Sequence, residues 1–170
     1  MAKPALAKSV SEDGVADRSS GPAGLTFGIL PRLLGYHLRR TQVAVFKHFA
    51  RTVAVVEDMT PGLFGMLQVI AANPGLSQSR LAEAMGVDRS TVVKVVRQLD
   101  RRGLIERTAS PLDGRSYCLR PSPRGRIAIE RMETNILRHE QDIASGLTAD
   151  EQQTLVRLLT RVYQQSHGAD

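Results

Sequence analysis

The sequence predicts a mainly α-helical protein with a small β-wing, and three observations lead to this fold class. Apolar residues recur every three or four positions over most of the chain, which is the period of an amphipathic helix. Two short strand-like runs flank Asp113-Gly114, a dipeptide that favours a tight hairpin turn. Aromatic residues make up only 4% of the 170 residues and Trp is absent, which argues against a large β-sandwich or barrel.

Composition narrows the class of protein. The single cysteine, Cys118, excludes an internal disulfide framework and suits a reducing compartment. No run reaches the roughly 18 apolar residues of a membrane span. Residues 1–24 lack the apolar stretch of a signal peptide, so we expect a disordered tail there. These observations predict a soluble, cytoplasmic protein with no membrane partner.

Residues 25–60 predict one long helix, from Leu30 to about Val56. Pro31 suits its first position, where the missing N–H costs nothing. A helix of this length would span roughly 40 Å. Since a small core cannot cover so long an apolar stripe, we expect part of it to contact another chain.

Residues 61–125 contain three shorter helical patterns, each preceded by a residue that commonly caps a helix N-terminus. The patterns cover residues 62–72, 77–85 and 88–102, and the capping residues are Thr60, Ser77 and Asp88. Strand-like residues follow at 104–108 and 116–120. Helices and hairpin in this order predict a winged helix-turn-helix, a module whose second helix is shaped to lie in the major groove of DNA.

Residues 126–170 complete two C-terminal helices. Ser122-Pro123 begins a helix that extends toward Ala144, and the sequence from Thr148 to Glu151 matches a capping box for a last helix to about Gln165. Long helices thus stand on both sides of the central module. We expect these outer helices to fold together, and onto those of a partner, as dimerisation elements.

The positive charge is concentrated in the central module. Residues 61–125 hold ten Lys and Arg against five Asp and Glu, and therefore +5 of the formal net charge of +6. The sequence pI is about 10.1. A charge excess confined to one small module predicts a polyanionic partner, with double-stranded DNA the partner that this fold would bind.

Four segments of the sequence resemble the MarR family of bacterial transcription regulators. They are LAEAMGVDRSTV at 81–92, LDRRGLIER at 99–107, DGRS at 113–116 and PRG at 123–125. The resemblance covers about 50 residues with closely set spacing, and the order of the helices extends it to most of the chain. It implies a homodimer whose first and last helices interdigitate and which binds an inverted-repeat operator.

The helix that Asp88 caps predicts the DNA-reading surface. We expect the first turn of this helix, and the face that continues from it, to enter the groove. For Arg97, a DNA contact and a solvated charge without a DNA contact are equally favoured. Ser77, Gln78 and Ser79 begin the preceding helix and are expected to contact phosphates. The predicted reading residues are Arg89, Ser90, Thr91, Lys94 and Arg97.

The hairpin between the two strands predicts a second contact. Arg115 would reach into a minor groove, where narrow A·T-rich tracts attract guanidinium groups. The family resemblance implies that Asp113 orients Arg115 through a salt bridge. The alternative is that Asp113-Gly114 only makes the tight turn, and both roles are compatible.

The first helix predicts where an effector binds. Regulators of this family usually release DNA when a small molecule wedges between the dimer helices and the reading heads. Residues 28–40 also resemble regulators of aromatic-acid catabolism, some of which respond to acyl-CoA esters. Solvated arginines or dimer salt bridges explain the same residues equally well. The predicted ligand residues are Arg32, Tyr36, His37, Arg39, Arg40, Phe64 and Met66.

Other classes of function find less support in the sequence. The sequence shows no nucleophile with a base, no phosphate-cradling glycine loop and no paired carboxylates. We therefore expect neither an enzyme nor a cofactor. The four histidines show no metal-ligand spacing, and nothing near Cys118 predicts a redox switch. The alternatives are a winged-helix protein–protein adaptor, or a DNA-binding activator without a small-molecule ligand.

Overall fold

The computed structural model describes residues 25–109 and 117–167. The chain forms two compact units, residues 1–41 and 42–170, and helix α1 (Leu34–Thr52) passes from the first into the second. The second unit continues with α2 (Ala54–Glu57), α3 (Pro61–Ala72), β1 (Leu76–Ser77), α4 (Gln78–Met85), α5 (Arg89–Arg101), β2 (Ile105–Ala109), β3 (Tyr117–Pro121), α6 (Pro123–Ile143) and α7 (Ala149–His167). The boundaries that we predicted after residues 24, 60 and 125 separate segments by their expected function, and they stay predictions.

The first unit begins with a short 3₁₀ helix rather than with the long helix that we predicted. Residues 30–32 form this turn, and Leu33 then adopts an extended conformation before α1 begins. The His37 ring lies 2.8 Å from the Pro31 carbonyl oxygen and takes up an acceptor that a continuous helix would use for its own ladder. The predicted single helix is therefore wrong at its start.

The predicted helix is also interrupted near its end. α1 stops at Thr52, and Val53 leads into the four-residue helix α2. Val53 is fully buried, so the chain bends where this branched side chain enters the core. α2 ends at Asp58, which adopts a left-handed conformation with φ of 45°. Helical spacing alone does not reveal such bends, because the apolar period continues across them.

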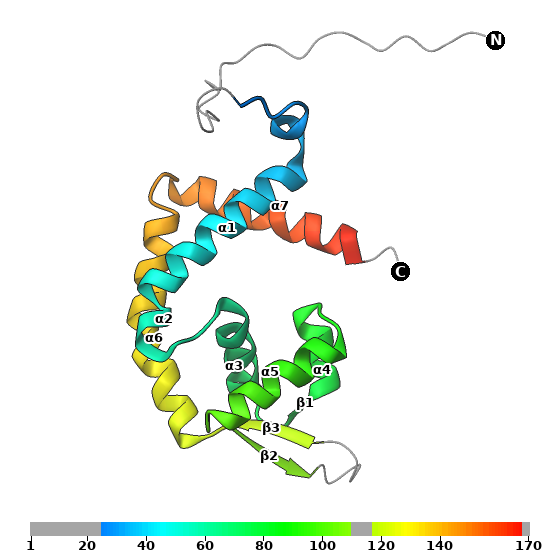
Figure 1. Cartoon of the computed structure of the whole chain (residues 1–170), viewed down its shortest axis with the longest axis vertical. Coiled ribbons are helices and arrows are strands. Elements are labelled where there is room, and N and C mark those ends of the chain that lie inside the picture. Colours follow the sequence, from blue (N-terminus) through cyan, green and yellow to red (C-terminus); the bar gives the residue numbers. More distant parts are fainter. Residues whose placement is uncertain (1–24, 110–116, 168–170) are drawn as a thin grey trace, which may run out of the picture. The chain divides into compact units, whose positions relative to one another are not determined.

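The winged helix-turn-helix predicted for the centre of the chain is confirmed. Figure 1 shows α3, α4 and α5 on one side of a small antiparallel sheet, with α6 leading away from β3. Thr60, Ser77 and Asp88 each accept a backbone N–H at the start of α3, α4 and α5, as predicted. Gly86 and Gly103 take the left-handed conformations that end α4 and follow α5.

The sheet has one strand more than the sequence indicated. The strand order is β1-β3-β2, and the two residues of β1 pair with Leu119 and Cys118. Leu76 and Ser77 escaped prediction because two residues are too few to show the alternation of a strand. The added strand joins the start of α4 to the wing, so the helix-turn-helix and the hairpin share one sheet.

The two C-terminal helices begin as predicted. Thr148 and Glu151 bond reciprocally through their side chains and backbone N–H groups, which is the capping box. At the start of α6, the buried Ser122 hydroxyl donates to the Gly103 carbonyl and accepts the Gly125 N–H. The Leu104 carbonyl accepts the N–H of Ser122 at 3.0 Å. These bonds fix α6 to the end of α5.

Gly125 permits this close approach. A Cβ atom added to Gly125 would overlap the backbone carbonyl of Leu104, which cannot move without breaking the bond to Ser122. The glycine in the family-like segment 123–125 is thus explained by packing.

A histidine pair joins α1 to α6 within the second unit. The Nδ1 atoms of His48 and His139 lie 2.7 Å apart, and the rings stack at 5.0 Å. The second ring nitrogen of His48, Nε2, lies 3.7 Å from the Asp142 carboxylate. The Phe49 ring packs edge-on against His139. His139 is 2% exposed. Nothing in the sequence predicted the pair, since its members are 91 positions apart.

We expect Gly125→Ala to lower the free energy of unfolding by about 1–3 kcal/mol, because the methyl group forces the backbone at Leu104 to move. Gly62→Ala is the matched control, since Gly62 lies in helix α3 with no atom within 4 Å of an added Cβ. The control is expected to be neutral or to gain about 0.4–1 kcal/mol. Urea unfolding at one protein concentration measures both, and equal effects would contradict the packing argument.

His139 makes stability depend on pH. Burial lowers the pKa of His139, His48 lowers it further, and Glu140 and Asp142 oppose the shift. Histidines of an unfolded chain titrate near about 6.5. The folded chain therefore binds this proton less readily, so the stabilisation is complete above that pH and is lost as pH falls through the lowered pKa. We expect the wild type to lose more unfolding free energy between pH 7.5 and 5.5 than His139→Gln. Parallel curves would contradict this.

Candidate nucleic-acid interface

The orientation of α5 follows from its buried stripe. Val92, Val96 and Leu99 are 0%, 1% and 0% exposed and pack in the core with residues of α3, α4 and α6. Because one side of α5 is completely buried, its opposite side must face solvent. That outer side carries the residues predicted to read DNA.

The N-terminus of α5 is fixed by Asp88. Its carboxylate accepts the Ser90 hydroxyl at 2.6 Å, the Thr91 hydroxyl at 2.9 Å and the Thr91 backbone N–H at 2.9 Å. The hydrogen bond from Ser90, followed by the two from Thr91, lowers the pKa of Asp88 to about 2. The carboxylate is therefore charged at neutral pH and holds the first turn of α5 in place.

The same bonds define what Ser90 and Thr91 offer to DNA. Both hydroxyl protons are directed at Asp88, so a bond to a phosphate oxygen requires one of them to leave that carboxylate. The hydroxyl oxygens remain available as acceptors, and the Thr91 methyl remains an apolar group. Ser90 is exposed and Thr91 half-buried. In this arrangement the two hydroxyl groups offer only acceptor oxygens to a partner.

The cations of α5 are exposed. Arg89 lies at the first helical position, and Lys94 and Arg97 follow on the solvent side. Within residues 25–109 and 117–167, none of these three side chains bonds to a carboxylate. Arg101, which the sequence analysis did not select, continues the row formed by Ser90, Lys94 and Arg97 at spacings of three and four. The spacing itself could have identified Arg101.

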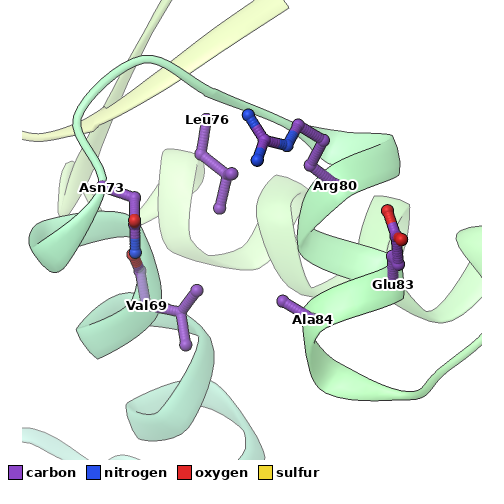
Figure 2. A pocket seen from close by; sticks show the side chains of 6 residues that line it. All are labelled: Val69, Asn73, Leu76, Arg80, Glu83 and Ala84. Carbon is purple, nitrogen blue, oxygen red and sulfur yellow. The ribbon is translucent and has the colours of Figure 1, made fainter.

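The N-terminus of α4 is the second part of the interface. Ser77 caps the helix by accepting the Arg80 N–H and, like Gln78, is half-buried, whereas Ser79 is exposed. Arg80 is also exposed, and Figure 2 shows its guanidinium beside Leu76 among the residues that line a pocket of about 290 Å³. The pocket lies between the end of α3, β1 and α4. Arg80 thus adds a cation, missed from sequence, to the end of α4 predicted to contact phosphates.

The wing is tied to the end of α5 by Arg107. Its guanidinium carbon lies 4.3 Å from the centre of the Tyr117 ring on β3, and Nη1 lies 3.6 Å from Asp100 on α5. Nε is buried with no hydrogen-bond partner among the described residues. This cation–π contact and ion pair set the wing strands against the recognition helix. Asp113 and Arg115, predicted at the wing tip, lie outside the described residues.

The predicted ligand residues fall in both units. In the first, Arg40 donates to the Tyr36 hydroxyl at 3.3 Å and its guanidinium lies 5.4 Å from that ring's centre. His37 is held by Pro31, and Arg32 is exposed. Arg39 is exposed as well. In the second unit, Phe64 is half-buried and Met66 is buried in the core.

No helix in residues 25–109 and 117–167 is long and apolar enough to cross a membrane. Within the same ranges, no three His, Cys, Asp or Glu side chains are placed to hold a metal ion.

A helix-turn-helix with an outward row of cations, joined to an antiparallel hairpin, defines the class of winged-helix DNA-binding proteins. The comparisons with known proteins agree. The MarR family model matches residues 57–116. The chain is 53% identical over 147 residues to a protein of Thauera aromatica named as the proposed transcriptional regulator of the hcr operon, covering 86% of this chain and 89% of that protein.

Solved structures extend the match to about four fifths of the chain. The regulator PcaV of Streptomyces coelicolor, solved with its natural ligand, is 34% identical with a TM-score of 0.77, covering 81% of this chain and 96% of that one. The repressor CouR, bound to a 23-mer DNA duplex, is 36% identical with a TM-score of 0.76, covering 82% and 98%. CouR has also been solved with p-coumaroyl-CoA. The chain belongs to the MarR family of transcriptional regulators.

The exposed position of Arg89 leads to a direct test. We expect Arg89→Ala to weaken specific DNA binding by about 1–3 kcal/mol, roughly 5- to 150-fold in Kd, because a guanidinium can pair with a guanine edge. Fluorescence anisotropy on DNA from upstream of the chain's own gene measures this. Arg138→Ala removes an equal charge from the exposed side of α6 and is the control. Equal losses of affinity in both variants would show that Arg89 contributes to DNA binding only through its positive charge.

Proposed function

We propose that the chain acts as a homodimeric repressor that binds a pseudopalindromic operator and releases it when an aromatic acid or its acyl-CoA ester binds. The observation that carries the DNA part is the construction of α5. One side of this helix is fully buried, and the other presents Arg89, Lys94 and Arg97 without carboxylate partners in the described part of the chain. An adaptor that had given up DNA would not need such a row of cations.

The apolar surface of α7 supports the homodimer. Large apolar side chains at spacings of three and four remain exposed along this helix, which costs free energy unless another surface covers them. They include Leu155, Val156, Leu158, Leu159 and Tyr163. α1 likewise exposes Val43 and Phe46. In a second copy the same helices offer the same apolar faces, so a two-fold dimer covers both at once. Two reading heads about 34–36 Å apart would then meet successive turns of one groove.

The first unit supports the effector. Tyr36 and Arg40 lie one turn apart on α1, and the structure brings Arg40 onto the Tyr36 ring. Arg32 precedes the extended Leu33 and therefore does not share this helix face, so its part in the site stays a sequence prediction. An aromatic ring with a guanidinium group beside it suits an aromatic carboxylate or the phosphates of a CoA thioester. The relatives solved with a natural ligand and with p-coumaroyl-CoA favour this chemistry. His37 and Arg39 belong to the proposed site, and Phe64 and Met66 stay sequence predictions.

Two further statements belong to the proposal. The chain carries out no reaction of its own, since it is related to transcriptional regulators rather than to enzymes. It works in the cytoplasm, where its operator is found. An activator that needs no ligand is the second candidate, and the ligand experiment separates it from a repressor released by an effector.

The experiment measures the Kd of the dimer for operator DNA with and without p-coumaroyl-CoA, with p-coumaric acid and free CoA as separate additions. Other aromatic-acid thioesters form the wider panel. We expect one class of compound to weaken DNA binding. Arg40→Ala should raise the concentration for half-release at least about tenfold, because it removes a charged hydrogen-bond donor, and should leave DNA binding intact.

Arg51→Ala is the matched control for Arg40→Ala, because Arg51 is an exposed arginine in the last turn of the same helix. Its response to the effector should equal that of the wild type. If Arg40→Ala fails to bind DNA, the division of labour between α1 and α5 is wrong. If no compound disturbs tight binding, the effector part of the proposal fails and the DNA part remains.

A further inference from the structure

The end of the recognition helix is bonded to the end of α2. Arg102, the residue that follows α5, directs its guanidinium at two backbone carbonyls: Nη1 donates to Asp58 at 2.9 Å and Nη2 donates to Glu57. Nη1 also lies 3.6 Å from the sulfur of Met59. A single side chain thus joins two segments that are more than 40 positions apart in the sequence.

The chemistry of this contact suits an arginine. The last carbonyls of a helix have no donors within the helix and carry its negative end. The planar guanidinium supplies several N–H groups at fixed angles, so it can serve two neighbouring carbonyls at once, which a lysine ammonium does less well. Arg102 is half-buried, so solvent competes less for these bonds than at the exposed Arg101.

α2 is connected to the rest of the second unit on its other sides. The Glu57 carboxylate, 12% exposed, pairs with Arg131 of α6 at 3.7 Å. Met59, directly after α2, is buried in the core. At its start α2 is joined through the buried Val53 to α1. α2 is therefore the segment through which α1 continues into the DNA-reading module, and Arg102 is the link from this segment to α5.

We infer that Arg102 is a positioning residue for DNA reading: its guanidinium holds the C-terminal end of α5 to the C-terminal end of α2, so a displacement of α2 turns the recognition helix. The N–H groups of its guanidinium are used on backbone carbonyls rather than on DNA. The coupling to an effector rests on the proposed function, because it requires a ligand that biases α1 and α2 toward a geometry unsuited to DNA.

The test compares three variants of the full chain. Arg102→Gln removes the fork and one charge, Arg101→Gln removes an equal charge one position away, and Arg102→Lys keeps the charge without the fork. The first readout is amide hydrogen exchange over residues 54–60 without DNA or ligand. The second is the ratio of operator Kd values with and without p-coumaroyl-CoA.

We expect exchange over residues 54–60 to become about tenfold faster in Arg102→Gln, intermediate in Arg102→Lys and unchanged in Arg101→Gln. The ligand-dependent ratio should fall at least about fivefold in Arg102→Gln, fall by less in Arg102→Lys and stay unchanged in Arg101→Gln. Arg102→Lys gives the same information, with a smaller change, if the glutamine variant does not fold.

Three results would overturn the inference. Equal exchange in Arg102→Gln and Arg101→Gln would show that the bond does not hold α2. Faster exchange with a wild-type ligand ratio would show that the bond carries no coupling. Equal loss of DNA binding in Arg102→Gln and Arg101→Gln, with unchanged hydrogen exchange, would show that Arg102 contributes only its positive charge. If the wild type ignores every thioester, the effector proposal fails, and exchange over residues 54–60 alone decides whether Arg102 holds α5.

Discussion

Burial of one side of α5 is the constraint on which the rest of the site depends. Val92, Val96 and Leu99 fill the centre of the core, and their burial is worth several kcal/mol in total. Rotating α5 to present another face would expose these side chains to water. The row that includes Lys94 and Arg97 therefore faces outward because of the core, before any DNA is present. The reading surface is as rigid as the hydrophobic packing behind it.

Local signals in the sequence predicted much of this architecture. Thr60, Ser77 and Asp88 mark helix starts because a capping bond needs only residues within three positions of one another. The bend at Val53 and the strand β1 left no such signal: the helical period runs through the first, and the second has only two residues. Local chemistry fixes where elements begin, and tertiary contacts decide where they bend.

The candidate site divides in the same way. Arg89 and Lys94 could be selected from the sequence because the Asp88 cap fixes the phase of the helix that carries them. Arg107 and Arg102 could not, since their partners Tyr117 and Asp58 come from other elements of the fold. Residues predicted to contact DNA are defined by their own helix, whereas residues inferred to set the angle of that helix are defined by what lies beside it.

Arg101 and Arg102 illustrate how position assigns different work to identical side chains. They are adjacent, and both belong to a basic run at the end of the recognition helix. Arg101 is exposed and continues the outward row, where its charge is free to act on a polyanion. Arg102 is turned about 100° further around the helix and meets the carbonyls at the end of α2. Both charges contribute to the field that DNA encounters, because hydrogen bonds to neutral carbonyls do not cancel a guanidinium charge. The exposed side chain can also reach toward DNA, whereas its neighbour is held against the end of α2 and sets the angle of the recognition helix.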